Sequence, residues 1–124
     1  MAESIERYLR MMPKTMRGMR CTRRMWDPAA DVYRTREGWI VKFELAGVAP
    51  DELEVWIAGD TLRVAGCRRD EVLNETVSYH QLEIIYSRFE RVIRFPCPIE
   101  GATVERHYKD GLLVLRLQSP EECE

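Results

Sequence analysis

A tight β-hairpin is predicted for residues 55–64, whose sequence reads VWIAGDTLRV. Residues 55–57 and 62–64 are apolar-rich segments, and between them stand Gly59 and Asp60. A Gly-Asp pair supplies the positive φ that a two-residue hairpin turn requires. The two segments are therefore expected to be antiparallel neighbours in a sheet.

The period-two pattern of this hairpin continues on both sides of it. Apolar residues alternate with other residues over 39–45 and 53–57, and again over 89–95, where Pro96 ends the run because proline cannot donate to a ladder. Asp110-Gly111 joins residues 103–109 to 112–117, with Leu113, Leu115 and Leu117 expected to face the core. Seven or eight short strands without a helical stretch predict an all-β fold, an antiparallel immunoglobulin-like β-sandwich.

The segment 68–85 is long for a hairpin loop. Its first four residues are charged, whereas residues 77–85 are β-prone and carry apolar and aromatic side chains. A charged spacer followed by a strand would let that strand leave its own sandwich and pair elsewhere. The alternative is an ordinary extra strand that folds back locally.

Composition fits one compact domain with a tail. The chain has 124 residues, of which 45% are hydrophobic, and a net charge of −2, which gives no global attraction to nucleic acid or acidic membranes. No apolar run approaches the roughly 18 residues of a spanning helix, and residues 1–10 lack the apolar region of a signal peptide. We expect a soluble cytoplasmic protein with a Met/Arg-rich N-terminal arm at 1–25, a β-domain at 26–117 and a short acidic tail at 118–124.

Cysteine spacing argues against a metal site. The chain has no CxxC motif and no Cys-His pair at ligand spacing, so we expect no metal and no cofactor. Without a secretory leader, all four cysteines are predicted to be reduced thiols. They are Cys21, Cys67, Cys97 and Cys123.

The N-terminal arm differs in chemistry from the rest of the chain. Residues 1–24 hold seven basic and two acidic side chains, a net charge of +5, whereas the other hundred residues sum to −7. All six methionines lie within residues 1–25. Helical spacing places five apolar residues on one face, but Pro13 interrupts the pattern, so the arm is expected to be partly helical or disordered. The five are Ile5, Leu9, Met12, Met16 and Met19.

Three interpretations of this arm stay open. Methionine side chains repack readily, so the arm could be an adaptable contact surface. An apolar stripe at helical spacing is equally consistent with an arm that packs over the core of the β-domain. A membrane-surface helix is the least favoured, because neither Trp nor Phe occurs before Trp26. If the arm is a contact surface, its binding residues are Ile5, Leu9, Met11, Met12, Met16 and Met19.

Six short motifs follow one another along residues 26–117. They are W-x-P-x-x-D-V-Y at 26–33, E-L-x-G-V at 44–48, G-x-x-L-x-V at 59–64, Y-H-x-x-E at 79–83, F-x-R at 89–91 and Y-x-x-G-x-L at 108–113. In kind and in order they resemble the motifs of the α-crystallin domain of the small heat-shock proteins.

The sequence departs from the family pattern at four places. Ser87 stands where the family usually has Gly, Arg106 where a small Ala is usual, and Phe95-Pro96 replaces Leu-Pro. Residues 118–124 lack the I-x-I hook that normally docks into a neighbouring subunit. The resemblance therefore does not predict large cages, and larger or mixed oligomers stay open.

The resemblance implies a homodimer formed by strand exchange and a groove that contacts tails and clients. Strand addition of this kind takes its affinity from main-chain hydrogen bonds. The implied dimer interface consists of Tyr79, His80, Gln81, Leu82, Glu83 and Ile84 against the partner's edge at Asp31, Val32 and Tyr33. The implied groove is lined by Leu53, Val55, Ile57 and Val104.

The expected function is that of an ATP-independent chaperone, a holdase that covers the sticky surfaces of partly unfolded client proteins under stress. No GxxxxGK motif is present. An enzyme is disfavoured because His80 and His107, the only histidines, have no nucleophile motif beside them. The alternative is a co-chaperone or scaffold of the related β-sandwich type that binds folded partners. Nucleic-acid binding by the arm is weaker still, since Tyr8 is its only aromatic residue before Trp26.

Overall fold

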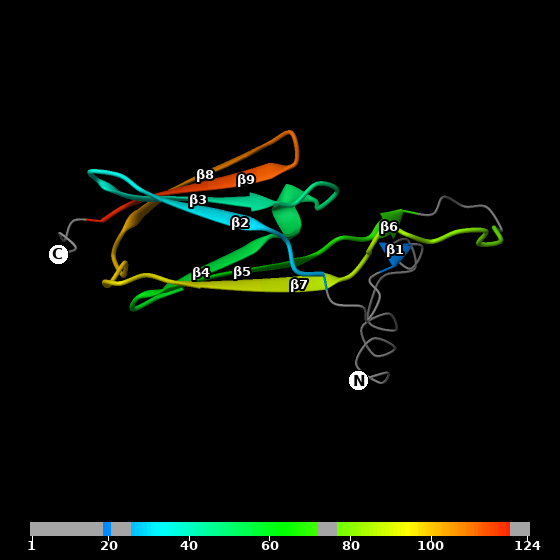
Figure 1. The fold of residues 1–124 in the computed structure, drawn as a ribbon, viewed down its shortest axis with the longest axis horizontal. Coiled ribbons are helices and arrows are strands. Elements are labelled where there is room, and N and C mark those ends of the chain that lie inside the picture. The colour runs from blue at the N-terminus through cyan, green and yellow to red at the C-terminus, as the bar shows by residue number, and fades with distance from the viewer. Residues whose placement is uncertain (1–18, 21–25, 72–76, 120–124) are drawn as a thin grey trace.

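The computed structural model describes residues 19–20, 26–71 and 77–119. Seven long strands form two stacked antiparallel sheets, one in the order β2-β3-β9-β8 and the other in the order β4-β5-β7 (Figure 1). This arrangement confirms the predicted β-sandwich. The strands are β2 Ala30–Arg34, β3 Gly38–Glu44, β4 Glu54–Ala58, β5 Thr61–Cys67, β7 Arg88–Arg94, β8 Thr103–Lys109 and β9 Leu112–Gln118, with the short 3-10 helix η2 at Pro50–Glu52.

The two predicted hairpins form at the expected turns. Ala58 pairs with Thr61 across Gly59, which has a φ of +60°, and Lys109 pairs with Leu112 across Asp110 and Gly111, with φ values of 53° and 80°. Gly111 is also closely packed, because a Cβ there would lie 2.9 Å from the Cβ of Ala46. Glycine is thus required at this second turn for both its backbone angle and its size.

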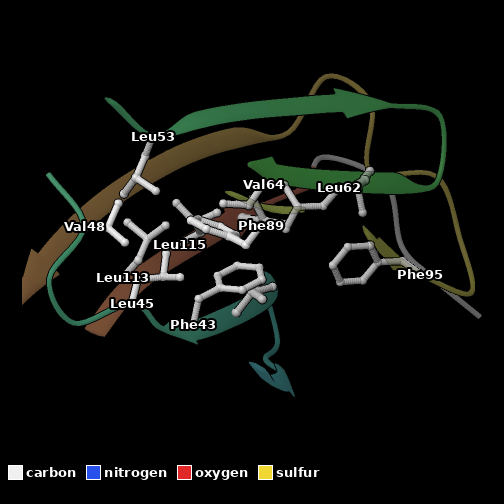
Figure 2. Close-up of a cluster of buried hydrophobic side chains, with 13 residues drawn as sticks. Phe43, Leu45, Val48, Leu53, Leu62, Val64, Phe89, Phe95, Leu113 and Leu115 are labelled. Carbon is white, nitrogen blue, oxygen red and sulfur yellow. The ribbon is translucent and has the colours of Figure 1, made fainter. Parts of the chain in front are cut away.

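Cross-strand pairs of apolar residues build the core between the sheets. Phe43 of β3 pairs with Leu113 of β9, and Leu62 and Val64 of β5 face them from the other sheet (Figure 2). Each fully buried aliphatic or aromatic side chain contributes about 1.5–3 kcal/mol to stability. The expectation that Leu113, Leu115 and Leu117 face the core is confirmed, since all three are fully buried.

The edges of the two sheets lie above one another. Arg91 of β7 forms an ion pair with Asp27, just before β2, with its Nη1 3.3 Å from Oδ1. Arg106 of β8 donates from Nη2 to the carbonyl of Leu53, the residue just before β4, at 2.8 Å. An arginine therefore spans each side of the sandwich, Arg91 the side between β2 and β7 and Arg106 the side between β4 and β8.

A small third pairing lies beyond one end of the sandwich. The two-residue strand β1 (Met19–Arg20) pairs with β6 (Asp70–Glu71), away from the two sheets (Figure 1). The predicted helical position of Met19 is therefore wrong, because backbone pairing with a distant segment overrides the local periodicity. The other predicted contact residues, Ile5, Leu9, Met11, Met12 and Met16, lie outside the described residues.

The prediction of reduced thiols is wrong for two cysteines. Cys67 and Cys97 are both disulfide-bonded. They do not bond to each other, because Cys67 ends β5 whereas Cys97 follows the end of β7 that pairs with Thr61, the first residue of β5. Six residue steps along a strand span roughly 20 Å, and bridged Cα atoms lie within about 7 Å. Sequence spacing carried no signal for these bridges. Cys21 and Cys123 lie outside the described residues.

Candidate functional site

Strand β2 is an open edge of the four-stranded sheet. Among the described strands it pairs only with β3. Val32 pairs with the fully buried Val41 and so lies on the core face, yet it is 42% exposed, and Tyr33 is 44% exposed. The edge is stiffened on its other face, where the ammonium group of Lys42 lies 5.1 Å from the Tyr33 ring centroid and the Tyr33 hydroxyl donates to Asp31 at 3.4 Å. An added strand would find here an edge that no second described strand covers, together with exposed apolar area.

Residues 68–87 join β5 to β7, and their described parts, 68–71 and 77–87, extend beyond the end of the sandwich (Figure 1). We call this segment the 68–87 loop. Its described part from 77 to 86 contains no strand residue, so the predicted strand over 79–84 is not formed within the single chain. His80, Gln81 and Glu83 are exposed there, as are Val77, Tyr79, Leu82 and Ile84.

Leu82 and Ile84 are the most exposed large apolar residues of the chain's described part, at 55% and 64%. In an extended chain, residues two apart lie on the same face. The loop would thus present an apolar stripe as soon as it formed a strand. The structure therefore holds, in one chain, an open strand edge and an apolar segment long enough to add to such an edge.

The residues predicted to line a groove lie on the opposite side of the sandwich. Val55 and Ile57 of β4 are half-buried, Leu53 is buried just before this strand, and Val104 of β8 is exposed. The side chain of Arg106 crosses from β8 to the Leu53 carbonyl at this side. One end of the predicted groove is therefore bridged by a charged side chain of the same chain.

Two neighbouring arginines anchor the base of the 68–87 loop. Arg68 donates to main-chain carbonyls, and the Nε of Arg69 lies 3.3 Å from the Glu52 carboxylate. Burial, and then the charge of Arg88, lower the pKa of Arg69 below its usual value. Both contacts were missed from the sequence, which marked these residues only as a charged spacer.

Both histidines lie at the surface of the molecule. His107 lies in β8 as predicted, whereas His80 lies in the loop rather than in a strand, and both are exposed. Within the described ranges, no group of three or more His, Cys, Asp or Glu side chains could hold a metal ion. In the same residues, no helix is long and apolar enough to cross a membrane.

Comparison with known proteins places this arrangement in a family. A sequence profile of the Hsp20/alpha crystallin family matches residues 31–124. The chain is 32% identical over 97 residues to spore protein SP21 of Stigmatella aurantiaca, covering 78% of this chain and 57% of the relative. It is 25% identical over 96 residues to small heat shock protein C4 of Rickettsia felis, covering 77% of this chain and 59% of the relative.

The fold agrees with a solved structure of the same kind. Heat shock protein 16.0 from Schizosaccharomyces pombe superposes with a TM-score of 0.70 at 27% identity, covering 80% of this chain and 92% of that one. The chain spans less than two thirds of the length of the two bacterial relatives above. With its sandwich and its ordered motifs, the chain belongs to the Hsp20/alpha-crystallin family of small heat-shock proteins, a non-enzymatic family whose membership implies a stress-chaperone role.

Proposed function

We propose that the protein is an ATP-independent holdase that works as a strand-exchanged homodimer. This proposal is supported by the presence of two features in one chain, the open β2 edge and the exposed apolar segment of the loop around Leu82 and Ile84. In the dimer, residues 79–84 of each subunit add to the β2 edge of the other. The same surface serves both subunits, which gives a closed two-fold assembly.

Register follows from the side chains on each face of the added strand. Leu82 and Ile84 lie on one face and cover Val32 of the acceptor edge, which is apolar and 42% exposed. Tyr79 and Glu83 then lie on the opposite face, beside Asp31 and Tyr33 of β2. A slip by one residue would bring Glu83 to the apolar face, so the register is well determined.

Client binding is assigned to the N-terminal arm and to the side of the sandwich between β4 and β8. The arm is basic and rich in methionine, a side chain that adapts to apolar surfaces of varied shape. The remainder of the chain has a net charge of −7, which would keep a loaded complex dispersed. The arm contacts partly unfolded chains and competes with their self-association.

The cytoplasm is the proposed location, and the disulfides at Cys67 and Cys97 bear on it directly. Cytosolic thiols are kept reduced, whereas disulfides persist in oxidising compartments. Fractionation of the native source with thiol labelling before lysis tests the location. Recovery of the protein in the soluble cytosolic fraction supports this location, and recovery outside the cytosol contradicts it.

A native mass measurement combined with a client-aggregation assay tests the proposed function. The purified full chain is mixed with a heat-labile client without nucleotide, and light scattering is followed during heating. The proposal expects a dimer or a multiple of it that suppresses scattering at near-stoichiometric ratios. A monomer that gives no protection would contradict it and favour a co-chaperone that binds folded partners.

A further inference from the structure

The 68–87 loop leaves the sandwich from a single point at the end of β5. Arg68 is the first residue after β5, and its backbone N–H donates to the Ser87 carbonyl at 3.0 Å, which joins the outgoing and returning chains just before β7 begins. Ser87 is fully buried. This pair is the base from which the exposed residues of the loop project.

The side chain of Arg68 holds that base from three directions. Its Nε donates to the Ile85 carbonyl at 2.8 Å, its Nη1 donates to the Ala46 carbonyl at 3.3 Å, and its Cζ lies 3.7 Å from the ring centroid of Trp26. These contacts come from the returning loop, from the turn after β3 and from the segment before β2. A single guanidinium therefore joins the loop to the segment that precedes β2 and to the turn that follows β3.

The turn after β3 is shaped to admit this arginine. Gly47 has a φ of +85°, and a Cβ added there would lie 3.1 Å from Cδ of Arg68. A larger residue at this position would press on the aliphatic part of the arginine. The backbone angle favours glycine independently, so the turn satisfies both requirements.

The hydrogen bond to Ile85 lies one residue from the exposed apolar stripe. The Ile85 carbonyl belongs to the peptide that joins Ile85 to Tyr86, so the bond from Arg68 fixes the chain direction immediately after the exposed stripe. Because a shift of one residue reverses the faces of a strand, this bond is placed to determine the register.

We propose that Arg68 is the positioning residue that fixes the angle and register of the 68–87 loop for strand exchange. This inference rests on the proposed strand-exchanged dimer. In a two-fold dimer, the loop of each subunit adds to β2 of the other subunit, and the two additions occur together. The angle between the loop and β2 within one subunit therefore decides whether both additions can form at once. Arg68 fixes that angle before association, which lowers the conformational entropy lost on binding.

The test compares three full-length variants by sedimentation velocity over a range of concentrations. Arg68→Met keeps an aliphatic stem against Gly47 but removes the side-chain donors, and Arg68→Lys restores a positive charge and a single donating group. Arg63→Met is the matched control, because Arg63 also lies over a tryptophan, 4.8 Å from the Trp56 ring centroid, but on the outer face of the other sheet. Urea unfolding at low concentration separates domain stability from association.

The expected result is a rise in the dimer Kd of roughly 10- to 100-fold for Arg68→Met, since each 1.4 kcal/mol of lost hydrogen bonding is tenfold. Arg68→Lys should be intermediate and Arg63→Met within about twofold of wild type. Hydrogen exchange at saturating concentration should show faster exchange over 77–86 in Arg68→Met.

Two results would overturn the inference, and they differ from failure of the dimer itself. A wild-type dimer whose Kd is unchanged by Arg68→Met, or is raised equally by Arg63→Met, removes the positioning role and leaves strand exchange standing. A wild-type chain that is monomeric at every concentration removes the dimer and the inference with it. If Arg68→Met does not fold, the Arg68→Lys variant provides the test. A wild-type dimer Kd and wild-type amide exchange over 77–86 in that variant would contradict the proposal.

Discussion

Replacing the apolar stripe of the loop by serine should break the dimer without unfolding the domain. The double variant Leu82→Ser with Ile84→Ser changes two side chains that are 55% and 64% exposed in the single chain and that the proposed dimer covers. Neither belongs to the core, so the urea midpoint of the domain measured at low concentration should stay within error of wild type.

The size of the effect follows from the area that remains to be buried. Full burial of a leucine or isoleucine contributes about 1.5–3 kcal/mol, so the exposed fractions leave about 1–2 kcal/mol for each side chain. Two subunits contribute four such side chains, and if about half of this area is covered the dimer loses about 2–4 kcal/mol. The dimer Kd should therefore rise roughly 30- to 700-fold.

Sedimentation velocity over a hundredfold range of concentration measures this change, with Val92→Ser as the matched control. Val92 is 47% exposed and pairs with Arg63 of β5, on the sheet that does not contain β2. The control should dimerise within about twofold of wild type. An unchanged Kd in the double variant, or an equal rise in the control, would refute strand exchange through this loop.

Three further outcomes follow from particular contacts. Arg106→Ala removes the hydrogen bond that spans the side between β4 and β8. It should lower the free energy of unfolding by about 1 kcal/mol and the thermal midpoint, measured by calorimetry, by about 4–8 °C. An unaltered midpoint would show that this bond does not stabilise the domain. Gly111→Ala places a Cβ against Ala46 at a residue with a φ of +80°. The free energy of unfolding, measured in urea, should fall by at least about 1–2 kcal/mol. An unchanged free energy would contradict the requirement for glycine at this turn. Alkylation of the native, unreduced protein should leave Cys67 and Cys97 unlabelled in peptide mass spectra and label both after reduction, and labelling of either before reduction would contradict its disulfide.

The strands and turns of the sandwich could be predicted because their determinants are local. Period-two alternation identified the core faces, and the pairs at 59–60 and 110–111 identified the tight turns, with positive φ at Gly59, Asp110 and Gly111. Each of these features depends on a few consecutive residues. Burial of the leucines in β9 follows from the same alternation.

The contacts that shape the candidate site depend instead on residues far apart in the sequence. Arg68 meets Trp26 and the Ala46 carbonyl only after the sheets have stacked, and Arg106 meets the start of β4 in the same way. The sequence showed that an arginine replaces the usual small residue at position 106, but it did not predict the hydrogen bond to the Leu53 carbonyl. The pairing of Met19 with β6 could not be predicted either, because helical periodicity considers only residues close together in the sequence.

Hydrogen exchange across the dimerisation range tests the central claim most directly. Amides of the β2 edge, residues 30–34, and of the loop, residues 77–86, are followed at concentrations below and above the dimer Kd. Addition of one subunit's loop to the other's edge predicts that both segments become protected together as the dimer forms, and that the double serine variant abolishes this protection. A dimer that forms while both segments exchange at their monomer rates would contradict the account.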